Sequence, residues 1–160
     1  MCVTFGTRIP FRGSVLEISP HGKNFVKFYG NKLLVPDHKK DTGTITMVFL
    51  QTFVQKQLEI EATRYAQQLN EHYTKISLRD VRSRWASCSE RGALMFSWRL
   101  VMAPPNVLSY VVAHEVAHLR HMNHSEKFWK QVFQLYGNHE KERLWLRKNG
   151  PILHSFAFSS

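Results

Sequence analysis

Residues 107–124 read Val-Leu-Ser-Tyr-Val-Val-Ala-His-Glu-Val-Ala-His-Leu-Arg-His-Met-Asn-His. The part from 107 to 119 is apolar on nearly every side of a helical projection, which predicts a buried helix. Residues four apart on a helix lie about 40° apart around its axis, so His114 and His118 project from one face in successive turns. Two imidazoles in these positions can reach one Zn²⁺ at about 2.0–2.1 Å each. If the chain turns back after His118, His124 becomes the third ligand.

A metal would also explain the polar residues in this apolar segment. An isolated buried carboxylate costs several kcal/mol, and unpaired buried imidazoles cost about 1–3 kcal/mol each. Incidental core histidines, the plainer alternative, would leave those costs in place. Glu115 stands beside the first ligand, where a carboxylate can take a proton from metal-bound water. Three protein ligands leave a fourth position open, which is typical of a catalytic site, so we expect one Zn²⁺ per chain.

Further side chains are interpreted from their spacing and residue type. His121 lies three residues after His118 and would be turned about 60° away on a continuing helix, which favours a surface or outer-shell role. Cys88 is interpreted as a packed thiol, not a nucleophile. Four residues are candidates for binding substrate, with a solvated sheet face or the hydrophobic core as the alternative: Arg82, Arg84, Arg99 and Trp85.

Composition and charge limit the class of protein. The chain has 160 residues, of which 43% are hydrophobic and 12% aromatic, and this indicates one folded domain with a real core. It shows no apolar run of roughly 20 residues, no secretory signal and only two cysteines, so we expect a cytoplasmic protein without a membrane partner. The net charge of +10 favours acidic partners, although it also serves solubility.

The patterns along the chain predict an α+β fold in a single domain, 1–160, with a small antiparallel strand layer packed on helices. Residues 11–36 are rich in short strands, with Gly30-Asn31 as a turn between two of them. A long helix is expected over 44–73, a β-hairpin over 76–101, and the metal-binding helices over 104–136. Met122-Asn123 should interrupt the first of these helices, and Ser125 should cap the second. A final basic helix is expected over 139–148.

Three segments together resemble one family. They are residues 82–89 (Arg-Ser-Arg-Trp-Ala-Ser-Cys-Ser), residues 97–105 (Ser-Trp-Arg-Leu-Val-Met-Ala-Pro-Pro), and residues 110–129 around the histidine motif. This stretch resembles the YgjP-like metal-dependent hydrolases, relatives of the SprT-like and Wss-type zinc metallopeptidases. The resemblance implies a zincin-like fold with the H-E-x-x-H motif on a buried active-site helix. It also implies His114, His118 and His124 as zinc ligands and Glu115 as the catalytic base.

Three functions remain open at this level. The first is a zinc-dependent metallopeptidase that acts on a peptide or protein through metal-activated water. The second keeps the metal but cleaves a nucleotide phosphoanhydride, as a pyrophosphatase would. The third is a DNA-associated SprT-like protease or nucleic-acid-binding protein that uses the basic surface.

Overall fold

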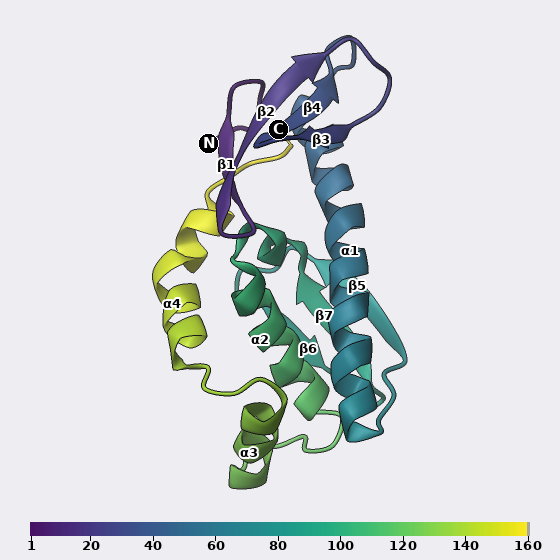
Figure 1. Ribbon diagram of the computed structural model, residues 1–160, viewed down its shortest axis with the longest axis vertical. Coiled ribbons are helices and arrows are strands. Elements are labelled where there is room, and N and C mark those ends of the chain that lie inside the picture. The colour runs from purple at the N-terminus through teal and green to yellow at the C-terminus, as the bar shows by residue number, and fades with distance from the viewer. Residues whose placement is uncertain (160) are drawn as a thin grey trace.

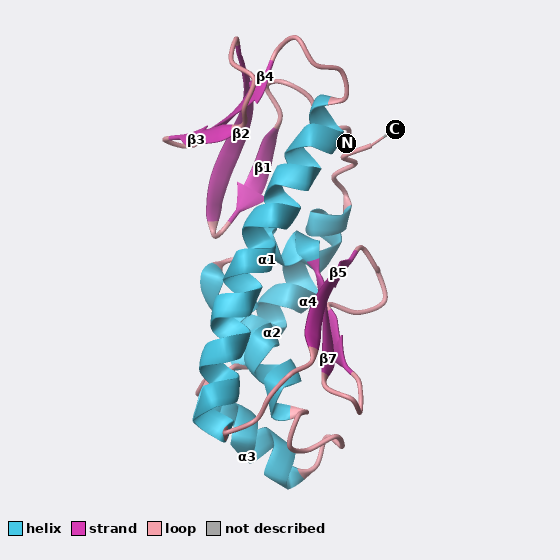
Figure 2. Ribbon diagram, turned by 90° about the vertical axis from the view of Figure 1, so that its right-hand side faces the viewer, coloured by secondary structure: helices cyan, strands magenta, loops and turns pink. Residues whose placement is uncertain are grey.

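The computed structural model describes residues 1–159 (Figure 1). Its longest element is the helix α1 (Thr42–Leu69). At 1.5 Å per residue, its 28 residues extend for about 42 Å. It runs past both sheets of the molecule (Figure 2). Its buried residues recur every three or four positions, which gives one apolar face along the whole helix: Gly43, Thr46, Leu50, Val54, Leu58, Ala62, Tyr65, Ala66 and Leu69.

The first sheet covers the N-terminal half of α1. It contains β1 (Arg8–Phe11), β2 (Ser14–His21), β3 (Lys27–Tyr29) and β4 (Lys32–Pro36) in the order β1-β2-β4-β3. The β3–β4 pair is the expected hairpin, turning at Gly30 with a φ of 58°. Strands β2 and β4 are parallel. Four phenylalanine rings pack between this sheet and α1, with neighbouring centroids 5.2–5.7 Å apart: Phe11, Phe28, Phe49 and Phe53.

The second sheet differs from the expected hairpin over 76–101. It contains β5 (Lys75–Arg79), β6 (Ala86–Cys88) and β7 (Ala93–Ser97) in the order β5-β7-β6. The hairpin is formed by β6 and β7 alone, whereas β5 runs parallel to β7. The chain leaves extended pairing between Asp80 and Trp85, which lets it reverse direction before β6. Residues Trp98–Met102 form a 3₁₀-helix, η1, and not the end of a strand.

Three helices complete the C-terminal part. The buried helix is α2 (Pro105–Ala117), with proline at its first position as predicted. Helix α3 (Glu126–Leu135) begins after Ser125, whose hydroxyl accepts the Phe128 N–H at 3.3 Å, so the expected cap is confirmed. The expected break at Met122-Asn123 is wrong by several residues, because α2 ends at Ala117 and the chain then turns through 118–120.

The last helix, α4 (Glu140–His154), continues six residues beyond the predicted end at Lys148 and contains Pro151. After it, Phe156 and Phe158 are buried, and the Phe158 ring lies edge-on to Trp98 at 5.0 Å. The same segment meets the N-terminus, where Ala157 pairs with Cys2 and the Val3 N–H donates to the Ala157 carbonyl at 2.9 Å. The two ends of the described chain therefore close against each other.

The α+β class and the strand layers packed on helices are confirmed, with one refinement. Both sheets are mixed, because each contains one parallel pair, where an antiparallel layer was expected. Within residues 1–159, no helix has the length and apolar character that crossing a bilayer requires.

Candidate metal centre

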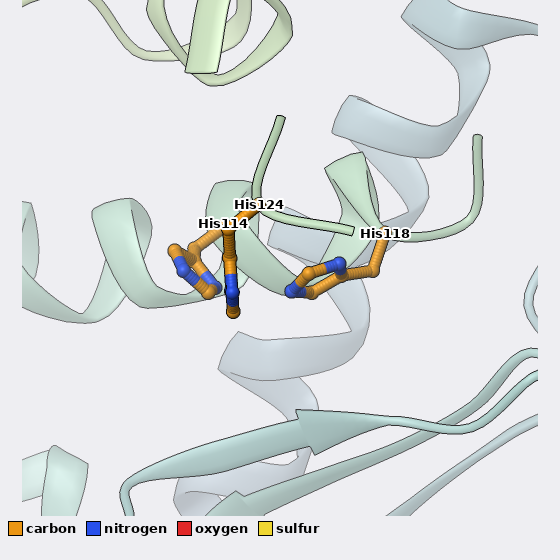
Figure 3. A group of neighbouring side chains, drawn as sticks. All are labelled: His114, His118 and His124. Carbon is orange, nitrogen blue, oxygen red and sulfur yellow. The ribbon is translucent and has the colours of Figure 1, made fainter. Parts of the chain in front are cut away.

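The structure brings together the three histidines that the motif singled out (Figure 3). One nitrogen from each of His114, His118 and His124 lies within 4.8 Å of the other two. His114 is in the last turn of α2, His118 is the residue that ends this helix, and His124 comes from the loop before α3. The expected return of the chain after His118 is therefore present.

The ring positions fit a tetrahedral metal. The ring centroids are 5.1 Å apart for His114 and His118, 5.4 Å for His114 and His124, and 4.8 Å for His118 and His124. An ion about 2.1 Å from each ligating nitrogen would lie roughly 3.2 Å from each centroid, and tetrahedral angles would then separate the centroids by about 5.2 Å. The cluster has this spacing before any ion is considered.

Hydrogen bonds orient two of the rings. The Nδ1–H of His118 donates to the His121 carbonyl oxygen at 3.0 Å, and the Nδ1–H of His114 donates to the Glu115 Oε2 at 3.0 Å. These tautomers are assigned from the partners, and they leave both Nε2 atoms free as ligands. Burial lowers the pKa of His118 and so favours the neutral imidazole that binds metal. His121 thus contributes through its backbone, in the outer-shell position expected for it.

The local sequence explains why the chain returns to the metal centre. After Ala117 the helix tightens, since the Leu119 N–H bonds to the Val116 carbonyl and the Arg120 N–H to the Ala117 carbonyl. The Arg120 guanidinium then donates to the Leu69 carbonyl at 2.7 Å and ties this turn to the end of α1. Ser125 restarts a helix directly after His124. The loop that carries His124 is therefore anchored at both of its ends.

Phe128 forms the apolar floor of the cluster, a role that the sequence analysis did not assign. Its ring is fully buried and lies 4.3–5.1 Å, centroid to centroid, from all three histidine rings. Trp129 follows it, 5.6 Å from His114 and 5.9 Å from His124. The available signal was the Phe-Trp pair one helical turn after His124. It predicted an apolar stripe but not its contacts.

A second aromatic group lines the other side of His114. The Tyr110 ring is 6.2 Å from that of His114 and stacks on His139 at 4.9 Å, and His139 in turn stacks on Trp129 at 5.5 Å. Burial raises the pKa of Tyr110 to about 12, and the positive charge of Arg143 acts in the opposite direction. The phenol is therefore protonated at neutral pH. Neither Tyr110 nor His139 was selected from the sequence, because Tyr110 lies in α2 and His139 lies directly before α4, far away in the sequence.

The catalytic carboxylate predicted from the motif is buried at the same place. Glu115 is 6% exposed and lies beside His114. Burial, together with a smaller contribution from the negative charge of Glu115, raises the pKa of the Cys88 thiol to about 11. Strand β6, which contains Cys88, packs against α2. A thiol with this pKa is protonated near neutral pH, in agreement with the packed role expected for Cys88.

Arg99 is an internal tie in the structure, which corrects its interpretation as a substrate contact. The side chain of Arg99 is buried and donates to both carboxylate oxygens of Asp80, at 2.7 and 3.2 Å. Its remaining donors reach the Leu153 and Phe156 carbonyls at 2.8 and 2.9 Å. All of its donor nitrogens are thus engaged in joining η1 to the loop after β5 and to the end of α4.

The other three substrate candidates lie along the loop before β6. Trp85 stacks on His154 at 4.9 Å, and a Cβ on Gly150 would come within 3.0 Å of its ring, so this indole packs on α4. It is a packing residue and not a wall of the histidine cluster. Arg82 and Arg84 are exposed in the loop and not paired in a strand, although both fall within the hairpin expected over 76–101. Their part in substrate binding stays a prediction.

Comparisons with known proteins agree with this geometry. The family model described as "YgjP-like, metallopeptidase domain" matches residues 5–149. No curated protein matches the chain. Among solved structures, the metallopeptidase zymogen abylysin of Pyrococcus abyssi is similar with a TM-score of 0.51 and 18% identity, over 59% of this chain and 94% of that one. The zymogen jannalysin of Methanocaldococcus jannaschii gives 0.48 and 19%, over 59% and 96%. The abylysin likeness supports the fold.

Proposed function

The chain belongs to the YgjP-like metallopeptidase family, and on that premise we propose that it hydrolyses peptide bonds with one zinc ion held by His114, His118 and His124. The observation that carries this proposal is the convergence of the three imidazoles within 4.8 Å, beside a buried glutamate. Three neutral nitrogen ligands with one position left for water form a donor set typical of catalytic zinc. Calcium and magnesium prefer oxygen ligands, which this cluster does not offer.

The protein's own groups have distinct parts in the proposed reaction. A bound zinc ion would supply an acidified water and polarise the scissile carbonyl. Glu115 would take a proton from the attacking water and pass it to the leaving amine. The His114 Nδ1–H that donates to Glu115 keeps the carboxylate next to the cluster. Phe128, beneath the three rings, excludes water from that side of the site.

An extended peptide substrate is supported by the position of β6. This strand is at the edge of its sheet, in the order β5-β7-β6, and it packs against α2, the helix that carries Glu115. The backbone groups on the free edge of a strand pair readily with another extended chain. We propose that the substrate backbone aligns along β6, which would present a peptide bond to the metal centre.

No specific observation supports the two alternative functions, phosphoanhydride hydrolysis and DNA association. A phosphoanhydride substrate would need cationic groups to bind its phosphates, and Arg99, one of the candidate substrate contacts, is committed to Asp80 and to backbone carbonyls. The DNA alternative rested on overall charge, which does not distinguish it from a soluble basic enzyme. Peptide hydrolysis is therefore the function we propose. The cytoplasmic location and the single domain stay predictions.

The test is the Glu115→Gln variant, with metal content and turnover measured side by side. Glutamine keeps nearly the same volume and still hydrogen-bonds water, but it cannot take a proton. We expect about one zinc per chain in both proteins, and a loss of peptide hydrolysis of about 10²–10⁴-fold in the variant, the usual share of general-base catalysis. Full activity with zinc retained would show that Glu115 is not the base. Loss of zinc would make it a ligand.

A further inference from the structure

Arg143 is a cation beside the metal centre that lacks an acidic partner. It lies in the first turn of α4, is exposed, and holds its guanidinium carbon 5.6 Å from the centroid of the Trp129 ring. Within residues 1–159, no carboxylate oxygen comes within salt-bridge distance of it. Arg99 and Arg120 differ in this respect, because they pair with Asp80 and Glu71.

The neighbours of Arg143 place it next to the catalytic histidines. Trp129, over which it lies, is in ring contact with both His114 and His124. The positive charge of Arg143 also acts on the Tyr110 hydroxyl, and the Tyr110 ring packs on His114 from a second direction. The guanidinium is thus one aromatic ring away from the metal ligands.

Neither acidic residue in the first turn of α4 forms a salt bridge with Arg143. Glu140 is exposed three positions before it, and the two side chains are not paired. Glu142 precedes Arg143 in sequence but is 7% exposed, and its Oε1 accepts a hydrogen bond from the Asn106 amide at 3.1 Å. It therefore points into the packing between α2 and α4, whereas Arg143 points outward over Trp129. The Arg143 guanidinium is therefore left without an ion-pair partner among the described residues, beside the proposed catalytic zinc.

An arginine fixed on an indole face suits the capture of a carboxylate. The cation–π contact orders the side chain in advance, and the planar guanidinium offers two parallel donors to one carboxylate. An extended peptide advances about 3.3–3.6 Å per residue. The Trp129 centroid is 5.6 Å from the Arg143 guanidinium carbon and 5.6 Å from the His114 centroid, so Arg143 lies at most about 11 Å from the His114 ring, a span of about three extended residues.

We propose that Arg143 determines specificity by binding a carboxylate of the peptide substrate close to the scissile bond. The proposal rests on the peptidase function proposed above. Such a carboxylate has two sources, the side chain of an aspartate or glutamate and the free C-terminus of a short peptide. In either case the enzyme selects peptides with negative charge near the cleavage point.

The test uses one cleavable peptide in four forms. The first is neutral with an amidated end, and the last is neutral with a free C-terminus. The other two are sets of six peptides each, in which aspartate or lysine is substituted in turn at each of the three positions on either side of the scissile bond. We expect kcat/KM of the wild-type enzyme to be about tenfold higher for one carboxylate form than for the neutral amide, the effect of one charge-assisted pair. A preference for aspartate identifies a side chain as the ligand, and a preference for the free end identifies the C-terminus.

Variants connect the preference to Arg143. Arg143→Ala should abolish it, Arg143→Lys should restore part of it, and Arg143→Glu should turn the preference toward the lysine peptide. Arg147→Ala, which removes the same charge one helical turn further along α4, should leave the preference unchanged. A merely structural role of Arg143 would lower turnover of all four forms together. The proposal is overturned if wild type shows no preference, or if Arg143→Ala keeps it.

A binding measurement separates this proposal from the peptidase function itself. Zinc-loaded Glu115→Gln protein, with and without Arg143→Ala, is titrated with the carboxylate and amide peptides, and Trp fluorescence is followed. We expect about tenfold tighter binding of the carboxylate form, lost with Arg143→Ala and weakened by salt. If no peptide is cleaved but this difference persists, the proposed function fails and the carboxylate site stands. Equal binding of both peptides refutes the carboxylate site alone.

Discussion

His118 is the most firmly held of the three histidines, and His124 the least. His118 is 7% exposed, donates to the His121 carbonyl and stacks on Phe128 at 4.3 Å. His124 is exposed in a loop. His124 would therefore contribute to the affinity for the metal, whereas the stability of the fold would not depend on His124.

The first prediction follows from this difference. His124→Ala should weaken zinc binding by more than the roughly 10–100-fold that loss of an outer-shell partner costs, while its circular dichroism spectrum stays that of the wild type. His121→Ala is the matched control, because His121 contributes its carbonyl oxygen and alanine keeps that atom. Zinc titration of the two variants decides the point. Equal affinities would remove His124 from the site.

At the scale of elements, the ion pair between Arg99 and Asp80 joins segments that are distant in sequence. Arg99 in η1 holds the loop after β5 through Asp80, and it holds the end of α4 through the Leu153 and Phe156 carbonyls. The hydrogen bond from Arg99 lowers the pKa of Asp80, against an opposing effect of burial. The carboxylate thus stabilises the fold in its charged form.

The second prediction gives the sign of this effect. A lowered folded-state pKa means that the stabilisation is present above the unfolded value of about 3.9 and is lost as the pH falls through the lower folded value. Asp80→Asn should lose about 1–2 kcal/mol at pH 7, a figure reduced from that of a buried pair because the Asp80 side chain is 45% exposed. Urea denaturation should show the difference from wild type shrinking below about pH 4.

The control for this prediction is a second ion pair that is expected to contribute little to the free energy of unfolding. Glu126 and Lys130 form an i,i+4 pair whose side chains are 88% and 75% exposed. Glu126→Gln should leave the free energy of unfolding nearly unchanged at every pH. If Asp80→Asn behaves in the same way, the internal tie contributes nothing to stability.

At the scale of the whole molecule, α1 joins the two sheets. Its N-terminal half packs on the phenylalanine cluster of the first sheet, and near its other end the Tyr65 hydroxyl is 2.6 Å from that of Ser109 in α2. The buried face of α1 is continuous between these contacts. One helix shared by two sheets should couple their unfolding.

The third prediction is a single cooperative unfolding transition. The four tryptophans, Trp85, Trp98, Trp129 and Trp145, all lie after the first sheet, so fluorescence reports on the C-terminal part alone. Calorimetry reports on all of the chain, and its transition should coincide with that of fluorescence. Leu58→Ala, which truncates a fully buried side chain of α1, should lower both midpoints together. A calorimetric transition without a fluorescence change would show that the first sheet unfolds separately.

The residues that carry the chemistry could be found in the sequence because their geometry is local. The spacing of His114 and His118 on a helix, Glu115 between them, and Ser125 as a cap depend on contacts within one turn or across one short loop. The long helix and the α+β class were also visible, since α1 repeats its apolar residues along its full length.

Contacts between segments far apart in sequence decided the rest. The sequence suggested Arg99 as a substrate contact, whereas in the structure its side chain is bound to Asp80 and to the Leu153 and Phe156 carbonyls. Strand β5 pairs in parallel with β7 because a loop reverses the chain before β6, and α4 continues through Pro151. The aromatic walls of the site come from α2, α3 and α4, which only tertiary packing brings together. Sequence spacing determined which atoms could bind a metal, and long-range packing decided which charges remain free to bind a substrate.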